Sequence, residues 1–375
     1  MRVLMAGGGT GGHLFPAIAI AQEFERIDQN CQIEMVGTRY GIEFGMRDSI
    51  KYRQSFIAVR GLPRTISMGL ITFPFRLLFA IWQSLRLCRR FQPDLVVGTG
   101  GYVAGPVIIA AALRKIPRAL QEQNSYPGLM TRRLARLADI VLIAYRRTRD
   151  FLPPDVKTEV LGNPIRRDIT AGDRNRALAE LGLKPDKKTI LILGGSQGAR
   201  RLNEAVLAGI DRLDDRVQLL WQCGKRDYKD VLARLDKKDF VISLFPFLNN
   251  MEMVYAAADL AISRAGALTI AELTACSVPS LLIPFPYATA DHQRYNAEEV
   301  ASMGAAEMIL ESDLGKVDLM EKAVNLVTSP QLETMKLAAR SAGKPQAAAD
   351  IAARLMALVG DKGVRIDNKN HTGAG

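Results

Sequence analysis

The chain has 375 residues, of which 50 are Lys or Arg and 39 are Asp or Glu, so its net charge is 50 − 39 = +11. Apolar residues make up 48% and charged residues 24%, which excludes a mainly disordered, collagen-like or coiled-coil protein. The length predicts two domains, or three. The four scattered cysteines form no CxxC pair, which favours a reducing compartment over a disulfide framework.

The positive charge is concentrated in the first half. Residues 1–162 hold 22 Lys or Arg against 12 Asp or Glu, and residues 163–375 hold 28 against 27. A surplus of ten in one half indicates an anionic partner, which is nucleic acid, anionic lipid or a phosphorylated substrate. Extra basic residues for solubility alone are the alternative.

Short apolar runs alternate with helix-like stretches along the whole chain. We expect strands at 3–6, 33–36, 95–98, 140–144, 190–193, 217–222, 260–263 and 280–284. We expect helices at 16–27, 199–209, 268–275 and 296–303. This alternation predicts parallel sheets with right-handed crossovers.

The segment 69–87, GLITFPFRLLFAIWQSLRL, is strongly apolar, but Pro74 and Arg76 interrupt it. It therefore predicts no membrane-spanning helix. We expect it to lie in a bilayer interface, with Phe75, Phe79 and Trp82 as the membrane contacts. The alternative is a helix packed on the sheet through one buried stripe, formed by Leu78, Ile81, Trp82 and Leu85.

A pattern of strand, glycine turn and helix occurs twice. LMAGGGTGGH (4–13) and VVGTGGYVAGP (96–106) in the first half match LILGGSQGAR (191–200) and ISRAGALTIAE (262–272) in the second. A linker is expected within 160–173. We predict two Rossmann-like, doubly wound α/β domains over 1–163 and 164–345, facing across a cleft. A helix near 346–359 would pack back on the first domain, and 360–375 would form a disordered tail.

The glycine turns leave room for backbone N–H groups and helix N-termini to bind an oxyanion. The loop 7–12 gives no unambiguous dinucleotide-binding register, and neither a P-loop nor Asp-x-Asp occurs, so no metal is predicted. Of the three histidines, His13 opens a helix beside the first glycine loop. A neutral imidazole there could act as a general base, and a capping or core imidazole is the alternative.

Seven motifs together resemble the MurG family of GT-B glycosyltransferases, family 28, over roughly residues 1–345. In chain order they are GGGTGGHLFPAIAIA (7–21), GTGGYVAGP (98–106), QEQNSYPG (121–128), GNPIR (162–166), GGSQGAR (194–200), SRAGALTIAEL (263–273) and PFPYATADHQRYNA (284–297).

The resemblance implies a GT-B fold and inverting transfer of GlcNAc from UDP-GlcNAc to the C4 hydroxyl of MurNAc in lipid I, forming lipid II for peptidoglycan. It implies a peripheral protein on the cytoplasmic face of the membrane, needing no metal or cofactor. The partners would be UDP-GlcNAc, lipid I, an anionic membrane surface and other proteins of cell-wall synthesis. A related enzyme acting on another lipid such as diacylglycerol, and a UDP-GlcNAc epimerase, are the alternatives. A nucleic-acid module is disfavoured because the aromatics cluster with aliphatics.

The resemblance also implies roles for single residues. His13 would be the base with Glu122 in support, and the acceptor diphosphate would meet Gly100, Gly101 and Tyr102. Within the donor set, Glu272 would bind the ribose. The full donor set is Thr10, Gly11, Gly12, Asn124, Arg166, Ser196, Leu248, Ala267, Leu268, Thr269, Ile270, Ala271, Glu272 and Gln293. Two positions depart from the family pattern. Gln121 stands where many members have His, so we do not expect it to be essential. Arg294 stands where some members have a second Gln.

Overall fold

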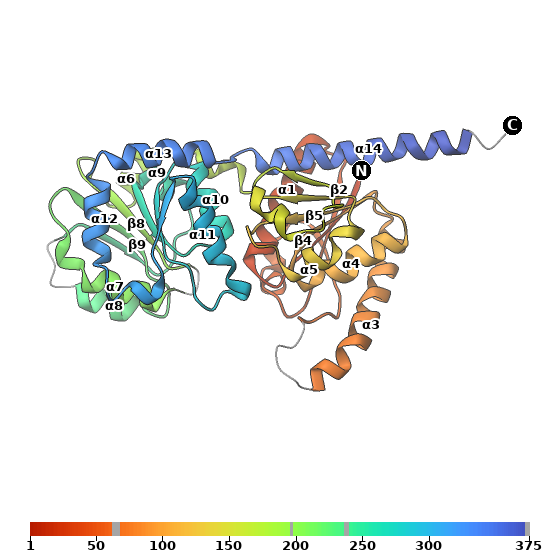
Figure 1. Ribbon diagram of the computed structural model, residues 1–375, viewed down its shortest axis with the longest axis horizontal. Helices are drawn as coiled ribbons and strands as arrows, with labels where there is room; N and C mark the ends of the chain where they lie inside the picture. Colours follow the sequence, from red (N-terminus) through yellow and green to blue (C-terminus); the bar gives the residue numbers. More distant parts are fainter. Residues whose placement is uncertain (62–67, 196–197, 236–239, 372–375) are drawn as a thin grey trace. The chain divides into compact units, whose positions relative to one another are not determined.

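The computed structural model describes residues 1–61, 68–195, 198–235 and 240–371. Contacts divide the chain into two compact units, one of Met1–Ile165 with Gln346–Gly375 and one of Arg166–Pro345. Each unit is a parallel sheet with helices on both faces (Figure 1). The predicted class, two doubly wound α/β domains, is confirmed.

The N-terminal unit contains a seven-stranded sheet in the order β3-β2-β1-β4-β5-β6-β7. The order reverses between β1 and β4, which makes that junction the topological switch point where ligands of such sheets bind. The strands are β1 Arg2–Gly7, β2 Gln32–Gly37, β3 Arg53–Phe56, β4 Leu95–Gly100, β5 Arg118–Glu122, β6 Ile140–Ile143 and β7 Thr158–Val160. The helices are α1 Gly11–Ile27, α2 Ile42–Gly45, α3 Met68–Phe91, α4 Gly101–Leu113, α5 Leu129–Leu134 and α14 Ala347–His371.

Alternating side chains of β1 reach two separate cores, as the two-residue period of a strand requires. Val3 and Met5 belong to a core that α1 and α14 complete, for example through Phe24 and Leu355. Leu4 and Ala6 belong to the core on the other face, to which α3 and α4 contribute. Helix α14 thus packs against the N-terminal unit, although it follows the second unit in the sequence.

The C-terminal unit repeats this plan with six strands in the order β10-β9-β8-β11-β12-β13, so its switch point lies between β8 and β11. The strands are β8 Lys188–Leu193, β9 Val217–Gln222, β10 Ile242–Phe245, β11 Leu260–Ser263, β12 Ser280–Leu282 and β13 Ala306–Met308. The helices are α6 Arg174–Glu180, α7 Arg200–Ala208, α8 Tyr228–Leu235, α9 Met251–Ala257, α10 Ala267–Ala275, α11 His292–Ser302, α12 Leu319–Val327 and α13 Gln331–Ala342.

Helix α14 continues beyond Val359 as far as His371. The disordered tail expected over 360–375 stays a prediction. Elongating an existing helix costs far less free energy than nucleating one. The glycines at 360 and 363 lower helix propensity without stopping the helix, and no proline follows them.

Helix α3 buries a stripe of small and aliphatic side chains, Ala80, Ser84, Leu87 and Cys88. The alternative stripe through Leu78 and Trp82 is therefore wrong, because these side chains are 64% and 52% exposed. They face outward with Phe75, which is 73% exposed, and Phe79, which is 49% exposed. No helix in the described part of the chain is both long and apolar enough to span a membrane.

A buried carboxylate anchors the C-terminal end of α3 to the sheet. The Glu34 side chain on β2 is fully buried and accepts hydrogen bonds from the Arg90 guanidinium of α3 and from Ser55 Oγ at 2.5 Å. Arg53 Nε lies 3.7 Å from its second oxygen. Removing one partner of a buried ion pair leaves a charge without compensation, so this contact holds α3 in place.

Substituting Arg90→Ala should lower the free energy of unfolding of the N-terminal unit by about 3 kcal/mol, the lower end for an orphaned buried charge because Arg53 stays nearby. Urea denaturation followed by circular dichroism measures this. Arg89→Ala, at an exposed neighbouring position of the same helix, is the matched control and should change stability by less than about 0.5 kcal/mol. Equal effects of the two substitutions would contradict the anchor.

Candidate functional site

The switch point of the N-terminal unit brings two helix N-termini together. Helix α1 starts at Gly11 after β1, and α4 starts at Gly101 after the neighbouring strand β4. Neither helix has an acidic residue in its first turn or a side-chain cap at its N-cap residue. Their N-terminal N–H groups and dipoles therefore favour a bound anion.

His13 lies at this junction and exchanges hydrogen bonds with Thr99 at the end of β4, once through its imidazole and once through its backbone carbonyl. Its Nδ1 is 3.2 Å from the Thr99 carbonyl oxygen and 3.1 Å from Gln123 Oε1, while Thr99 Oγ1 donates to the His13 carbonyl at 2.7 Å. A carbonyl oxygen can only accept, so Nδ1 carries a proton, and in the neutral imidazole Nε2 then has the lone pair. The imidazole is thus arranged to accept a proton at Nε2.

Two of the three residues predicted to meet the acceptor diphosphate, Gly100 and Gly101, lie against the same imidazole. Gly100 has φ +109°, and a Cβ at this position would lie 2.6 Å from His13 Nδ1. Any side chain here would displace the imidazole, so glycine is required for close approach as well as for its backbone conformation. Tyr102 lies close by on the first turn of α4, against the glycine loop at Gly9.

A buried carboxylate already occupies part of the first glycine loop. The backbone N–H of Gly9 donates to Glu43 Oε2 at 2.8 Å, and the Thr38 N–H donates to Glu43 Oε1 at 2.8 Å. The predicted anion-binding capacity of loop 7–12 therefore does not extend to this N–H group. The N–H groups that remain for an anion are those at the start of α1, where Gly11 and Gly12 follow Thr10.

Glu122, predicted to support the base, organises the loop that follows β5. Its carboxylate accepts hydrogen bonds from Asn124 N and Nδ2, both at 3.1 Å, from Gly128 N at 3.0 Å and from Thr131 Oγ1 at 2.5 Å. The side chain that contacts His13 belongs to the next residue, Gln123. Gln123 is not among the residues predicted from the sequence, although its place inside the QEQN motif is a usable signal.

In the C-terminal unit, Glu272 lies on α10, the helix that follows β11 at the switch point. The buried Tyr255 hydroxyl of α9 donates to Glu272 Oε2 at 2.8 Å. Burial raises the pKa of Glu272, and neither the Tyr255 hydrogen bond nor the positive charge of Arg166 reverses that shift. Burial, with the neighbouring Glu272, also holds the pKa of Tyr255 well above its usual range.

The other predicted donor contacts in this unit have protein partners. Arg166 pairs with Glu252 at 3.4 Å. The Leu248 N–H donates to Gln222 Oε1 at 2.8 Å, and Gln293 Oε1 accepts from the Phe285 N–H at 3.0 Å. A ligand at these groups would exchange one hydrogen bond for another. Four further members, Leu268, Thr269, Ile270 and Ala271, follow Ala267 along α10, and Ser196 lies outside the described residues.

The turn before Gln293 is strained. Ala290 and Asp291 both adopt the left-handed region, with φ +53° and +54°, although neither is glycine. Such residues persist where the surrounding structure demands them, and they are often found at functional sites. They set the start of α11, on which Arg294 pairs with Glu298 at 3.0 Å.

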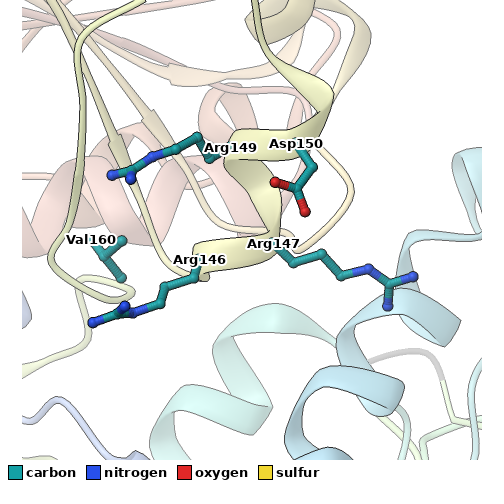
Figure 2. Close-up of a pocket in the computed structure, with 5 residues that line it drawn as sticks. All are labelled: Arg146, Arg147, Arg149, Asp150 and Val160. Atoms are coloured by element: carbon teal, nitrogen blue, oxygen red, sulfur yellow. The ribbon is translucent and has the colours of Figure 1, made fainter. Parts of the chain in front are cut away.

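A basic pocket of about 430 Å³ lies in the N-terminal unit, after β6 (Figure 2). Arg146 and Arg149 extend on the same side as Val160, and Arg147 extends the other way (Figure 2). Arg149 Nε donates to Thr158 Oγ1 at 2.8 Å, which fixes that guanidinium. These arginines contribute to the basic surplus of this half of the chain. Among the described residues, no group of three His, Cys, Asp or Glu could hold a metal ion.

Comparison with known proteins gives the family. The glycosyltransferase family 28 N-terminal domain model matches residues 3–143, and its C-terminal domain model matches residues 189–355. The chain belongs to glycosyltransferase family 28. An enzyme of Chlorobaculum parvum, named UDP-N-acetylglucosamine--N-acetylmuramyl-(pentapeptide) pyrophosphoryl-undecaprenol N-acetylglucosamine transferase, is 39% identical over 96% of this chain and 99% of its own length. The Thermoanaerobacter sp. (strain X514) enzyme of the same name is 38% identical over 94% of this chain and 98% of its own.

One solved structure agrees with this family, and a second shares the fold. The crystal structure of Acinetobacter baumannii MurG has a TM-score of 0.77 at 30% identity, and the match covers 95% of this chain and 99% of that one. The Neisseria meningitidis UDP-GlcNAc 2-epimerase bound to UDP-GlcNAc has a TM-score of 0.65 at 16% identity, covering 95% and 99%. The second likeness shows the fold alone.

The raised pKa of Glu272 predicts a pH-dependent gain from Glu272→Gln. A carboxyl group with a raised folded-state pKa contributes stability below its unfolded pKa and loses it as pH rises through the folded value. The glutamine keeps an acceptor for Tyr255 without the buried charge. Thermal unfolding should therefore show the variant more stable than wild type near pH 7.5, with the difference shrinking toward pH 4.

The control for this experiment is Glu333→Gln, at an exposed position on α13. It should show no such growth of the stability difference with pH. A Glu272→Gln variant that is less stable than wild type at neutral pH would contradict the assignment of a raised pKa.

Proposed function

We propose that the chain transfers GlcNAc from UDP-GlcNAc to the C4 hydroxyl of MurNAc in lipid I, forming lipid II. The observation that carries this proposal is the His13 imidazole, held by Nδ1 at the switch point beside two helix N-termini. The activity named for relatives that are 38–39% identical over nearly the whole chain supports it.

In the proposed reaction, His13 Nε2 removes the proton of the acceptor C4 hydroxyl as that oxygen attacks C1 of GlcNAc. The bond from C1 to the UDP oxygen breaks, and the configuration at C1 inverts. A positioned base of this kind contributes about 10²–10⁴-fold to the rate. The start of α4, with Gly100, Gly101 and Tyr102, would receive the acceptor diphosphate.

Donor binding is assigned to the C-terminal unit. The N-terminus of α10 and Arg166 would stabilise the charge on the departing UDP, so we propose that no metal is required. Glu272 would accept hydrogen bonds from the ribose hydroxyls, and the backbone at Leu248 would meet the uracil. Gln293 would contact the sugar. The raised pKa of Glu272 fits this role, because a buried carboxylate gains compensation when two hydroxyl groups donate to it.

We further propose that the protein is peripheral to the cytoplasmic face of an anionic membrane. The exposed aromatic side chains of α3 support this, since Phe79 and Trp82 stack with their centroids 5.6 Å apart and the Arg86 guanidinium lies 5.9 Å from the Trp82 ring. Apolar rings beside arginine suit the boundary between acyl chains and phosphate headgroups.

A transfer assay with UDP-GlcNAc and a lipid I analogue tests the reaction. We expect product in the presence or absence of EDTA, and His13→Ala should lower kcat by about 10²–10⁴-fold with a modest change in UDP-GlcNAc binding. His371→Ala is the matched control and should retain full turnover.

Three outcomes of this assay would each contradict one part of the proposed reaction. Transfer to diacylglycerol but not to lipid I would overturn the acceptor. Free UDP and ManNAc without an acceptor would indicate an epimerase. An unchanged kcat in His13→Ala would remove His13 as the base.

The triple substitution Phe75→Ser, Phe79→Ser and Trp82→Ser should reduce sedimentation with anionic vesicles, because it removes the apolar surface of α3 that would enter the bilayer. Turnover of a soluble acceptor analogue should survive, since all three side chains are exposed. Leu337→Ser, at a position on α13 that is 68% exposed, is the control and should leave vesicle binding unchanged. Vesicle binding equal to wild type in the triple variant would rule out this contact surface.

A further inference from the structure

A chain of buried amides lies behind His13. Gln121 and Gln123 at the end of β5 are 1% and 2% exposed, and Asn163 is 4% exposed. The Asn163 Nδ2 group donates to the Gln123 carbonyl at 3.0 Å, and Gln121 Nε2 lies 3.5 Å from Asn163 Oδ1. Buried polar groups of this kind specify one arrangement when they are satisfied together.

The network fixes which end of the Gln123 amide faces His13. Its Nε2 group is surrounded by acceptors, with the Thr99 carbonyl at 2.7 Å, the Gln121 carbonyl at 3.2 Å and Gln121 Oε1 also in contact. Rotating the amide by 180° would turn its oxygen toward these oxygens and leave buried acceptors without a donor. The Oε1 atom must therefore be the end that meets His13 Nδ1.

We propose that Gln123 is a positioning residue that holds His13 in the Nδ1–H tautomer, leaving the Nε2 lone pair for the acceptor hydroxyl. This inference rests on the proposed role of His13 as the base. The Thr99 carbonyl alone is a weaker restraint, because it already accepts the shorter hydrogen bond from Gln123 Nε2. Gln123 Oε1, at 3.1 Å, is the second acceptor for the imidazole proton, and it lies slightly closer to Nδ1 than the Thr99 carbonyl does.

Gln121 takes part in this arrangement, although its departure from the family pattern predicts that it is not essential. Gln121 accepts from Gln123 Nε2 with its side chain as well as its backbone, so it helps to set the amide orientation. A neutral histidine at this position would offer one acceptor nitrogen for the same purpose. The departure from the family pattern therefore preserves the hydrogen bond on which the tautomer depends.

The test is to observe the His13 tautomer directly by ¹⁵N NMR of the full chain labelled at histidine. The chain has only three histidines, so loss of signals in His13→Ala assigns the His13 ring nitrogens. In wild type we expect Nδ1 to show the shift of a protonated nitrogen and Nε2 that of an unprotonated one. In Gln123→Met, which has similar volume but no acceptor, the two shifts should move toward each other. A wild-type ring protonated at Nε2, or unchanged shifts in Gln123→Met, would overturn the proposal.

A second experiment measures the steady-state kinetics of the same variant. Gln123→Met should lower kcat about 10-fold, the cost of one neutral hydrogen bond, while KM for UDP-GlcNAc stays within about twofold. Gln218→Met removes an equally buried amide in the C-terminal unit, bonded to Lys184 and Thr189, and should leave the tautomer and kcat unchanged. Full turnover in His13→Ala would instead refute the base of the proposed reaction, and the NMR result would still decide the role of Gln123.

Discussion

The pair of hydrogen bonds between Thr99 and His13 is the constraint on which the N-terminal site depends. Thr99 Oγ1 donates to the backbone of α1 while the Thr99 carbonyl faces the imidazole, so the end of β4 fixes both the helix and its side chain. This contact requires glycine at two positions. A Cβ at Gly7 would lie 1.9 Å from Thr99 Oγ1, and one at Gly100 would strike the imidazole. Part of the glycine pattern that predicts phosphate binding is therefore required for packing the base.

In both units, several of the polar groups that are proposed to bind a ligand already have a partner in the protein. His13 is held by Gln123, Glu272 by Tyr255, and the Leu248 N–H by Gln222. Such partners avoid the free-energy cost of burying a polar group without a hydrogen bond. They also fix the geometry before a ligand arrives, which reduces the ordering that binding would otherwise require.

The sequence predicts the architecture well because long apolar strands are buried on both faces. Runs such as 190–193 and 217–222 lie fully inside the sheet and are recognised by composition alone. The strands β3 and β7 are not predicted because they are short and polar and lie at sheet edges, where side chains are only partly buried. The edge strands β10 and β13 and the inner strand β5 are not predicted either. Gln123 escapes for a different reason. Two of the three acceptors around its Nε2 belong to Gln121 in the same motif, but the third is the Thr99 carbonyl, which only the fold brings to it from β4.

Helix α3 combines a face that packs on the sheet with a second, exposed face that carries large aromatic side chains. Small residues, Ala80 and Ser84, form much of its buried face, so the large aromatic residues are left for the outside. The helix does not depend on those rings for its attachment, because Glu34 holds its far end through Arg90. The exposed aromatic face is thus free to serve a surface outside the protein. The basic surplus of residues 1–162 supports the proposed contact with an anionic membrane, since an anionic bilayer attracts arginine beside apolar rings more strongly than a neutral one does.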